Sequence, residues 1–424
     1  MKYKLIVTSI LLTCLFACKN TKDRITDLNV IDIEYGMENL TGLKVSDFGK
    51  SIRYIPLETT DDCLVGDVPI IKVLKNYIVI ENPERHGYNC LLFDKKDGRF
   101  IAEIGSRGQG PAEFSSNFSW TDEKEEFLYF IRQSNQLLKY DMKGTFSGNI
   151  SFSTPPGLAS YYVLTESEII GYFTGLGQMN EFSLGFFDKE GNLNDTIPTL
   201  YPRKIISNPD EIANFSLFRG RSGFDSYGIW ADGGLYIIGY KNGQLQIIPE
   251  RNARIWKHHD HIRFKEDFID TIYTVSNTQL IPSIVFNTGK YHLPVAEATM
   301  RDLSNDRIFI ADVSENNTVV FFQCLHGWNV NTRAEKHGLY TGLFDKKTGE
   351  VKIGKNSDGI EDDLTQFMPF SPMGMSTSGE FISLIESYKV MDWLEKHPEA
   401  RNNDKLSFLA TLDEEANPIV ILIE

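Results

Sequence analysis

The sequence predicts an all-β fold, a six-bladed β-propeller of four-stranded antiparallel blades that is closed by its N- and C-terminal strands. Three observations support this prediction. A short turn phrase recurs along the chain, segments rich in β-branched and aromatic residues lie between its copies, and one long segment has a helical pattern. A four-stranded unit that repeats at about 40–50 residues is typical of a propeller blade.

The turn phrase consists of an aromatic residue, an Asp and, a few residues later, a Gly. Its copies are residues 93–98, 140–144, 187–191 and 344–349, and residues 286–289 are interpreted as a degenerate copy. In such a turn Asp or Asn caps the backbone, Gly adopts a positive φ, and the aromatic residue packs between sheets. Because Asp94, Asp141 and Asp188 are evenly spaced, the phrase predicts a hairpin at the same place in successive blades.

Short segments between these turns predict strands. They are residues 70–74, 77–80, 127–131, 234–238 and 307–311. Their residue types favour strand, and their lengths argue against helix. Residues 384–401 predict the one helix, with Pro398 marking its end. A pair of β-sandwiches is the alternative, but it would not predict one turn phrase that recurs in phase.

The two ends of the predicted domain are also strand-like. Residues 418–424 form a β-branched run that needs a partner for its backbone, and Pro56 suits residues 52–57 to a sheet edge. Pairing the two segments in one blade would close the ring.

The N-terminus predicts export. Lys2 and Lys4 precede an apolar run, residues 5–16, that is shorter than the roughly 20 residues needed to span a bilayer. Residues 1–17 are therefore expected to be a signal peptide. Residues 15–18 resemble a bacterial lipobox, so Cys18 is expected to carry lipid, although an ordinary secreted protein with an incidental cysteine is the alternative. Residues 18–49 would form a tether and lead-in, and residues 50–424 one propeller domain.

Charge excludes one class of partner. The chain has 58 acidic and 43 basic residues and a formal net charge of −15, whereas a general nucleic-acid binder needs a positive surface. An anionic domain is held away from a membrane surface, so we expect a monomer attached to the membrane only through its lipid and tether. Which side of the membrane it faces stays open.

Three cysteines remain after the signal peptide and Cys18 are set aside. Cys63 and Cys90 could pair in an oxidising compartment, but apolar burial is the interpretation we favour for both and for Cys324. No CxxC or zinc-knuckle spacing is present.

Four phrases resemble a known family. Residues 54–59, 104–114, 270–273 and 417–420 are similar to the six-bladed β-propeller lipoproteins of anaerobic gut bacteria, which are related to NHL and TolB-like propellers. The resemblance covers nearly the whole mature chain and implies the fold and a cell-envelope location, but no general activity. Ala112, where the family usually has a second glycine, and Asn287 depart from the pattern and affect the expected shape of their loops.

The glycine-rich loop that contains Gly105, Gly108 and Gly110 does not predict a phosphate site. Its spacing matches neither GxGxxG nor the P-loop, and Pro111 follows in place of a helix start. We interpret it as a crossover between blades, whose glycines permit a tight path.

Charged loop residues are the candidate ligand-binding groups. They are Arg107 and Glu113 in the glycine-rich loop and Arg219 and Arg221 further along the chain. Loops at a propeller rim usually carry binding, although a solvated loop cation is the ordinary interpretation of each arginine.

Metal and catalytic motifs are not convincing. The run His258-His259-Asp260-His261 is metal-like, but on a strand at most His259 and His261 would point the same way, so an exposed loop is the default. No GxSxG motif is present. We therefore name no catalytic residue, metal ligand or cofactor.

The remaining histidines and the acidic runs give no site either. His86, His292, His326 and His337 have no spacing that forces a triad. The acidic runs at residues 61–62, 361–363 and 414–415 are interpreted as charges that aid solubility.

Two functions stay open at this stage. The first is a lipid-anchored binding or scaffold module of the cell envelope for a glycan, peptide or protein. The alternative is a hydrolase or lyase that acts on a carbohydrate or lactone-type substrate at the mouth of the central channel. The residues that line the channel would distinguish the two.

Overall fold

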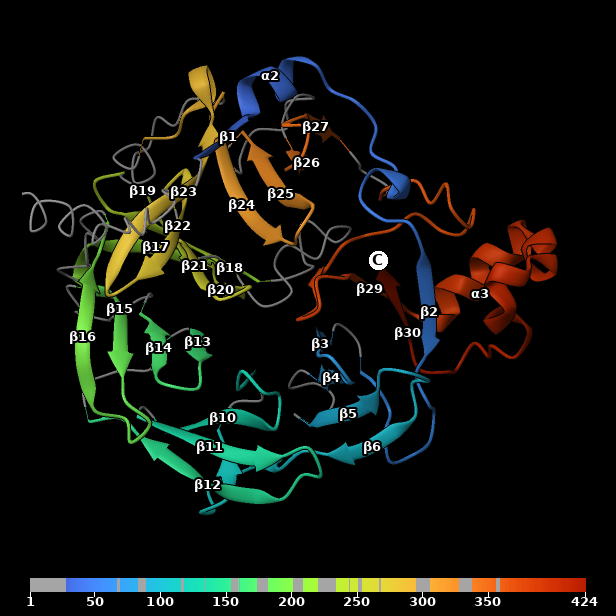
Figure 1. Cartoon of the computed structure of the whole chain (residues 1–424), viewed down its shortest axis with the longest axis horizontal. Coiled ribbons are helices and arrows are strands. Elements are labelled where there is room, and N and C mark those ends of the chain that lie inside the picture. Colours follow the sequence, from blue (N-terminus) through green and yellow to red (C-terminus); the bar gives the residue numbers. More distant parts are fainter. Residues whose placement is uncertain are drawn as a thin grey trace, which may run out of the picture.

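The computed structural model confirms the predicted ring of six blades (Figure 1). It describes residues 28–66, 69–82, 89–115, 118–133, 135–153, 159, 161–173, 182–200, 209–219, 234–243, 245–250, 254–266, 268–294, 306–327, 338–355 and 359–424. Within each blade, neighbouring strands of the chain pair in an antiparallel manner. The first strand of a blade lies towards the centre of the ring and the last lies at its outer edge (Figure 1).

We number the blades along the chain. Blade 1 consists of β3 (Ile70–Val73), β4 (Tyr77–Glu81), β5 (Cys90–Asp94) and β6 (Phe100–Glu103). Blade 2 consists of β9 (Ser119–Thr121), β10 (Phe127–Gln133), β11 (Gln136–Asp141) and β12 (Phe146–Ser151). Blade 3 consists of β13 (Tyr161–Leu164), β14 (Ile169–Tyr172), β15 (Phe182–Phe187) and β16 (Leu193–Pro198).

The second half of the ring uses both ends of the chain. Blade 4 consists of β20 (Arg254–His258), β21 (His261–Lys265), β22 (Thr271–Ser276) and β23 (Gln279–Asn287). Blade 5 consists of β24 (Ile308–Glu315), β25 (Val319–His326), β26 (Gly338–Asp345) and β27 (Val351–Gly354). Blade 6 consists of β28 (Gly374–Met375), β29 (Phe381–Ile385), β30 (Ile419–Ile423) and β2 (Ile52–Pro56).

A further sheet is an insertion and not a blade. It consists of β17 (Ile212–Arg219), β18 (Gly234–Tyr240) and β19 (Leu245–Glu250), which come between blades 3 and 4 in the sequence. The innermost strands of blades 3 and 4, β13 and β20, contact each other directly, and Tyr172 of blade 3 packs on Phe264 of blade 4. The strand predicted at residues 234–238 is therefore confirmed, but it lies outside the ring.

The recurring turn phrase connects the third and fourth strands of blades 1, 2, 3 and 5. In each copy the Asp side chain accepts backbone hydrogen bonds from the turn, as Asp141 Oδ1 does from Thr145 N at 2.8 Å. The Gly has a positive φ in each, from 74° to 91°. The aromatic residues are buried in the seam with the preceding blade, as predicted; they are Phe93, Tyr140, Phe187 and Phe344.

The turn glycines also explain why the phrase recurs in phase. A Cβ on Gly98 would lie 2.1 Å from Pro56 O, on the outer strand of the preceding blade. The same holds for Gly144 against Glu103 O at 2.5 Å and for Gly191 against Ser151 O at 2.3 Å. These three turns thus dock on the backbone of the preceding blade, which leaves no room for a side chain.

The degenerate copy at residues 286–289 was a wrong interpretation. These residues follow β23, the fourth strand of blade 4, and do not connect its third and fourth strands. That connection is a two-residue turn in which Asn277 and Thr278 have φ of 47° and 58°. Positive φ at both positions is the tight hairpin geometry that a short turn between twisted strands prefers, so this blade needs no Asp-Gly phrase.

The ring closes as predicted. Strand β2 pairs antiparallel with β30, with Ile52 opposite Ile423 and Pro56 opposite Ile419. Glu424 N donates to Ser51 O at 3.0 Å and extends the pairing by one step. Pro56 lies in the edge strand of this blade, where its missing N–H breaks no ladder.

Residues that precede β2 wrap around the ring. Strand β1 (Asn29–Asp32) pairs in parallel with β23 at the outer edge of blade 4, and α2 (Ile33–Glu38) follows it. A Cβ on Gly36 of α2 would lie 2.6 Å from Ile353, so the helix sits directly on blade 5. The chain then passes through a 3₁₀ turn, η1 (Val45–Asp47), to blade 6. Part of the expected lead-in is therefore packed on the propeller.

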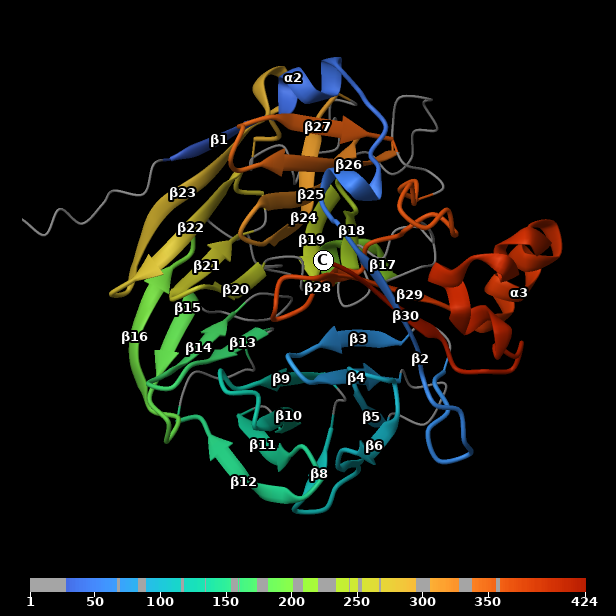
Figure 2. The same cartoon turned by 45° about the vertical axis from the view of Figure 1, so that its right-hand side comes forward.

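The predicted helix is shorter than expected. Helix α3 (Ser387–Lys396) ends before Pro398, which begins a 3₁₀ turn, whereas Leu384 belongs to β29. The helix and the 3₁₀ turns η7 (Pro398–Asn402) and η8 (Asp404–Ala410) form an insertion that projects outside the ring (Figures 1 and 2). Among the described residues, no helix combines the length and hydropathy needed to cross a membrane.

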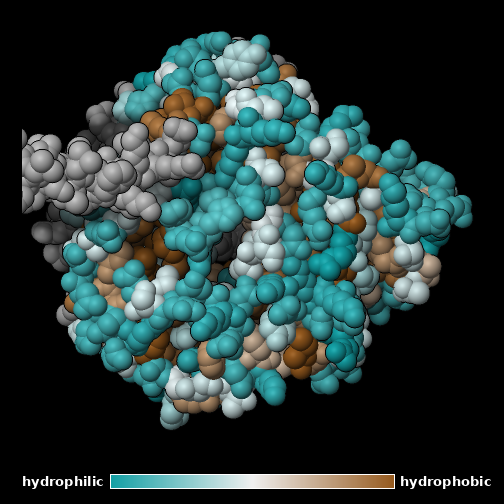
Figure 3. All heavy atoms as spheres, in the orientation of Figure 1, coloured by the Kyte–Doolittle hydropathy of each residue, from teal (hydrophilic) through white to brown (hydrophobic). Residues whose placement is uncertain are grey.

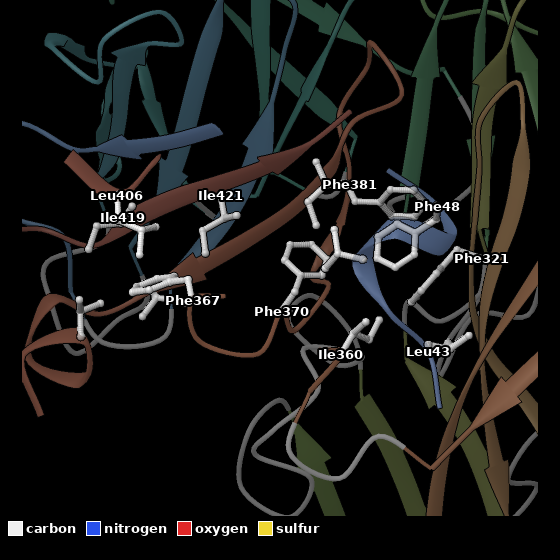
Figure 4. Close-up of a cluster of buried hydrophobic side chains, with 14 of the residues drawn as sticks. Leu43, Phe48, Phe321, Ile360, Phe367, Phe370, Phe381, Leu406, Ile419 and Ile421 are labelled. Atoms are coloured by element: carbon white, nitrogen blue, oxygen red, sulfur yellow. The ribbon is translucent and has the colours of Figure 1, made fainter. Parts of the chain in front are cut away.

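Apolar clusters fill the seams between neighbouring blades. In the seam between blades 5 and 6, the Phe48 ring lies 6.0 Å from that of Phe321 and 4.8 Å from that of Phe381 (Figure 4). Phe48 comes from the segment that wraps the ring, so this segment is part of the core. Burial of a large apolar side chain stabilises the fold by about 1.5–3 kcal/mol.

Candidate functional site

The propeller has two different faces. The turns between first and second strands and between third and fourth strands lie on one side, which we call the turn face. The loops between second and third strands and the crossovers from one blade to the next lie on the other, which we call the crossover face. Pairing of successive strands in opposite directions imposes this separation.

Hydrogen bonds join neighbouring blades on the turn face. Lys75 N of blade 1 donates to Glu125 Oε2 of blade 2 at 2.7 Å, and Glu123 N of blade 2 donates to Leu164 O of blade 3 at 2.9 Å. Further round the ring, Asn316 Nδ2 donates to Gly379 O and Thr377 N to Val73 O. The inner turns are therefore held together by backbone groups and short side chains.

One ion pair on this face skips a blade. Lys257, on the innermost strand of blade 4, bonds Glu123 in blade 2, with blade 3 between them. This hydrogen bond is the main cause that lowers the pKa of Glu123. The pair is partly exposed, so its stabilising effect is small. Its position nevertheless ties together two blades that are not neighbours.

A buried ionic network lies at the same end of the seam between blades 4 and 5. Glu315, whose side chain is 1% exposed, accepts from Arg263 Nε at 3.3 Å and from Lys346 Nζ at 2.7 Å. His258 Nε2 lies 3.5 Å from Glu315 Oε1. Burial is the main cause that lowers the pKa of His258 to about 4, with Lys346, His259 and Arg263 adding to it against the opposing effect of Glu315.

This network revises the interpretation of the histidine run. His259 and Asp260 form the hairpin turn between β20 and β21, and they and His261 are exposed, as the default interpretation had it. His258 instead points into the seam and serves the ionic network. Among the residues described, no group of three or more His, Cys, Asp and Glu side chains is placed to hold a metal ion.

The crossover face carries two Asp–His pairs at the other end of this seam. His292 Nδ1 lies 3.1 Å from Asp270 Oδ2, which also accepts from Thr288 Oγ1 at 2.9 Å. The His292 side chain is 56% exposed and that of Asp270 is 19% exposed. Asp270 thus fixes the orientation of an imidazole that is open to solvent.

The second pair lies on the neighbouring blade. His326 Nε2 is 3.7 Å from Asp306 Oδ1, and the Asp306 side chain is 78% exposed, whereas that of His326 is 5% exposed. Ile308 joins the two pairs, because it bridges to His292 on one side and pairs with His326 on the other. The Tyr291 ring meets the His326 ring edge-on at 5.4 Å.

Sequence reasoning did not find this arrangement. It named His292 and His326 as histidines without a triad spacing, and the ladder from one blade to the next is what brings them together. The signal was weak: Asp270 lies in a phrase used for fold recognition, and His292 follows the misinterpreted turn at residues 286–289. His86 and His337 lie outside the described residues.

The sequence-predicted ligand residues do not gather at this place. Glu113 Oε2 accepts from Gly110 N at 2.7 Å within the glycine-rich loop, and a Cβ on Gly108 would lie 1.9 Å from the same oxygen. The loop is a crossover from blade 1 to blade 2, as interpreted, and Arg107 is exposed on it in β7 (Ser106–Arg107). The ligand-binding roles of Arg107 and Glu113 stay predictions.

Of the other two candidate arginines, Arg219 is described, and its backbone ends strand β17 in the inserted sheet. Arg221 and Cys18 lie outside the described residues, so their predicted roles also stay predictions.

One acidic run has a structural role, which corrects its interpretation as solubility charge. Asp362 is 6% exposed and accepts from the backbone N–H groups of Leu364, Thr365 and Phe367. It also accepts from Tyr54 Oη at 3.1 Å, in the strand that closes the ring. Burial is the main cause that raises the pKa of Tyr54.

Two further carboxylates are fully buried near the crossover face. Glu81, at the end of β4, accepts from Ser119 N at 2.8 Å and pairs with Lys72. Glu266, after β21, accepts from Ser183 Oγ at 2.6 Å. Each bond joins neighbouring blades 1 and 2 or 4 and 3, so these groups hold the crossover ends of the seams together.

The described cysteines are buried and free, as favoured from the sequence. Cys63 and Cys90 do not pair. Burial raises the pKa of the Cys90 and Cys324 thiols, so both stay protonated and unreactive.

The surface in Figure 3 is mostly hydrophilic, with small separate hydrophobic groups, and is hollowed at the middle of the ring. Nine large apolar side chains of the described chain are exposed. They are Leu28, Val30, Tyr35, Leu40, Leu64, Ile101, Phe146, Ile281 and Tyr388.

Comparisons with known proteins support the fold. A family model described as "Domain of unknown function (DUF4934)" matches residues 28–424. The structure is similar to that of a Bacteroides fragilis NCTC 9343 protein described as exported, with 16% identity, a TM-score of 0.59, and coverage of 94% of this chain and 99% of that one. A member of the DUF4221 family from Bacteroides vulgatus ATCC 8482 matches at 13% identity and a TM-score of 0.42, over 88% and 96% of the two chains. No curated protein matches.

Proposed function

The chain belongs to the family described as "Domain of unknown function (DUF4934)", and from that premise we propose that it is a lipid-anchored propeller of the cell envelope that binds its ligand on the crossover face. The observation that carries the choice of face is the contrast between the two ends of one seam. Between blades 4 and 5, Glu315, Arg263 and Lys346 at the turn face are largely buried and paired with one another, whereas His292 and Asp306 at the crossover face are exposed.

A rigid ring supports this role. The turn face is joined around its inner edge by interblade hydrogen bonds, and Lys257 and Glu123 connect blades that are not neighbours. Binding residues usually lie on loops that a rigid scaffold positions, and the crossover face carries the long connections of this ring.

The lipid anchor rests on the sequence. The basic residues, the short apolar run and Ala17-Cys18 predict acylation of Cys18, and the Bacteroides fragilis protein with a similar fold is described as exported. Replacing the cysteine by Cys18→Ala should move the protein from the membrane fraction to the soluble fraction without changing the fold. Recovery of the variant in the membrane fraction would contradict the anchor.

The binding face is tested in living cells with a photo-crosslinking residue. Lys290→p-benzoylphenylalanine places the probe on the crossover face, on a residue that is 53% exposed in the connection from blade 4 to blade 5, and Lys143→p-benzoylphenylalanine places it on the turn face as a matched control. Benzophenone attacks C–H bonds of any ligand, so the chemistry of the ligand need not be known. We expect adducts at position 290 and none at 143. Adducts at neither position, or equally at both, would contradict the proposal.

A hydrolase remains the second candidate because of one observation. Asp270 and His292 have the separation and orientation of a carboxylate that directs a general base, with the imidazole open to solvent. Hydrolysis requires this imidazole to accept a proton, so release of p-nitrophenol from p-nitrophenyl acetate or glycosides that His292→Gln abolishes would favour the enzyme over the binding module.

A further inference from the structure

The five residues Asp270, Tyr291, His292, Asp306 and His326, here called the Asp–His site, have a chemistry that selects one class of ligand. We propose that this site binds a neutral oligosaccharide, an inference that rests on the proposed function and names the ligand class for the same face.

The first step concerns shape. His292, Ile308 and His326 are neighbours on one ladder, in which each step is about 5 Å. The ladder therefore spans a length comparable to that of one or two sugar rings; its exposed groups are His292 and Asp306, whereas the His326 side chain is 5% exposed. Asp306 lies two residues before Ile308 and stands at the same end of blade 5.

The second step concerns hydrogen bonding. The Asp306 carboxylate is 78% exposed and accepts only, so it binds hydroxyl donors. His292, whose Nδ1 is engaged with Asp270, has its Nε2 on the exposed side of the ring and in the neutral form accepts a hydroxyl there. Two neighbouring hydrogen-bond acceptors, the Asp306 carboxylate and His292 Nε2, suit the adjacent hydroxyl groups of a sugar.

The third step concerns the aromatic ring. Tyr291 is partly exposed and lies between the two pairs, next to His292 in the chain and edge-on to His326. Lys290 Nζ lies over one face of the ring, 5.1 Å from its centroid, and the negative partial charge of the other face suits the positively polarised C–H groups on one side of a sugar. Its hydroxyl adds a donor and an acceptor at the edge of the site.

The fourth step excludes other ligands by charge and polarity. Two carboxylates on a protein of net charge −15 disfavour an acidic ligand; beside the site, Lys290 is paired with Glu34 and Glu38, and Arg307 donates to Lys290 O at 3.5 Å. None of the exposed large apolar side chains of the described chain belongs to the five residues of the Asp–His site, so these five residues offer an amphipathic helix or a lipid no aliphatic surface. A neutral polyhydroxylated ligand remains.

The test uses calorimetry with purified protein and defined oligosaccharides. The neutral probes are cellohexaose, maltohexaose, xylohexaose and mannohexaose, and the acidic probe is hexagalacturonate. We expect at least one neutral probe to bind with a Kd of about 1 mM or tighter and the acidic probe at least about tenfold more weakly. Failure of every neutral probe to bind at millimolar concentration, or equal binding of hexagalacturonate, would overturn the proposal.

Variants then locate the binding. Asp306→Asn and Tyr291→Ala should each weaken the neutral probe by about tenfold or more, because each removes a contact at the centre of the site. Asp306 is exposed, so its replacement leaves the fold intact, and Tyr388→Ala on α3 is a matched control that should bind normally. Unchanged binding by both site variants would contradict the site. If no oligosaccharide binds but adducts still form at position 290 in cells, the ligand class is wrong and the binding face stands.

Discussion

At the residue scale, buried ionisable groups have structural roles that their sequence context conceals. Glu315 and Asp362 both lie in ordinary polar stretches of sequence, and each is nearly buried. Glu315 receives its partners from blades 4 and 5, and Asp362 receives its partners from the backbone N–H groups of Leu364, Thr365 and Phe367 and from Tyr54. Arg263, Lys346 and Tyr54 are distant in the sequence from the carboxylates that they bond, so a linear sequence does not display these partners.

His258 should make stability depend on pH. Its pKa is lowered to about 4 in the fold, below the value of about 6.5 in an unfolded chain. The unfolded state therefore binds a proton first as the pH falls, so stability is complete above pH 6.5 and decreases between pH 6.5 and 4. The loss amounts to at most about 3 kcal/mol.

The variant His258→Asn should flatten this part of the curve. Urea unfolding followed at several pH values between 7 and 4.5 measures it, and His261→Asn on the exposed hairpin is the control that should keep the wild-type slope. A slope that is the same in both variants would show that His258 does not cause the pH dependence.

Replacement of Asp362 by Ala should lower the free energy of unfolding much more than the same replacement of Asp61. Asp362→Ala leaves several buried donors without an acceptor, which should lower the free energy of unfolding by about 2–4 kcal/mol. Asp61→Ala changes an exposed residue and should stay within about 0.5 kcal/mol of the wild type. Denaturant unfolding of both variants decides whether the acidic run at residues 361–363 is structural, and equal stability of the two would contradict it.

At the element scale, the sequence predicts the recurring hairpin turn but not its contact with the preceding blade. Asp caps and Gly relieves backbone strain in any such hairpin, and the sequence shows both. The docking of Gly98, Gly144 and Gly191 on the preceding blade is a tertiary contact. The error at residues 286–289 arose because Phe, Asn and Gly also suit the end of a strand, where they lie in blade 4.

Two glycines separate the contributions of backbone strain and of the docking contact to the free energy of unfolding. Gly98 and Gly349 both have a φ of 74°, but a Cβ on Gly98 meets Pro56 O at 2.1 Å, whereas a Cβ on Gly349 meets nothing within 4 Å. Gly349→Ala should lower the unfolding free energy by about 1 kcal/mol through backbone strain alone. Gly98→Ala should lose at least about 1 kcal/mol more, because the turn must move away from β2. Equal losses, measured by denaturant unfolding, would show that the docking contact is unimportant.

At the scale of the whole molecule, the six-bladed ring and its closure were predictable from the sequence. The strand-like ends of the chain and Pro56 indicated how they pair, and β2 with β30 confirms it. The inserted sheet β17–β19 and the wrap of β1 and α2 were not predicted, because neither belongs to the repeat. The Asp–His site was not predicted either, since the ring alone brings its residues together.

The pairing of β2 with β30 that closes the ring should contribute strongly to the free energy of unfolding. Ile421 pairs with Tyr54 on one side and Ser383 on the other, and all five residues of β30 are buried. Ile421→Ala should lower the unfolding free energy by about 2–5 kcal/mol. Deletion of residues 419–424 should cause aggregation or a large fall in Tm, because it exposes the edges of β2 and β29. A truncated protein that remains monomeric with unchanged Tm would contradict closure by the termini.

The measurement that tests the central claim most directly is the accessibility of the two faces in the cell. Single variants Lys290→Cys on the crossover face and Lys143→Cys on the turn face are labelled with a maleimide in permeabilised cells and after purification; the buried thiols of Cys63, Cys90 and Cys324 give little background. A ligand on the crossover face predicts that Lys290→Cys is protected in cells and labelled once purified, while Lys143→Cys is labelled in both. Equal labelling of the two positions in cells would contradict a ligand-binding crossover face.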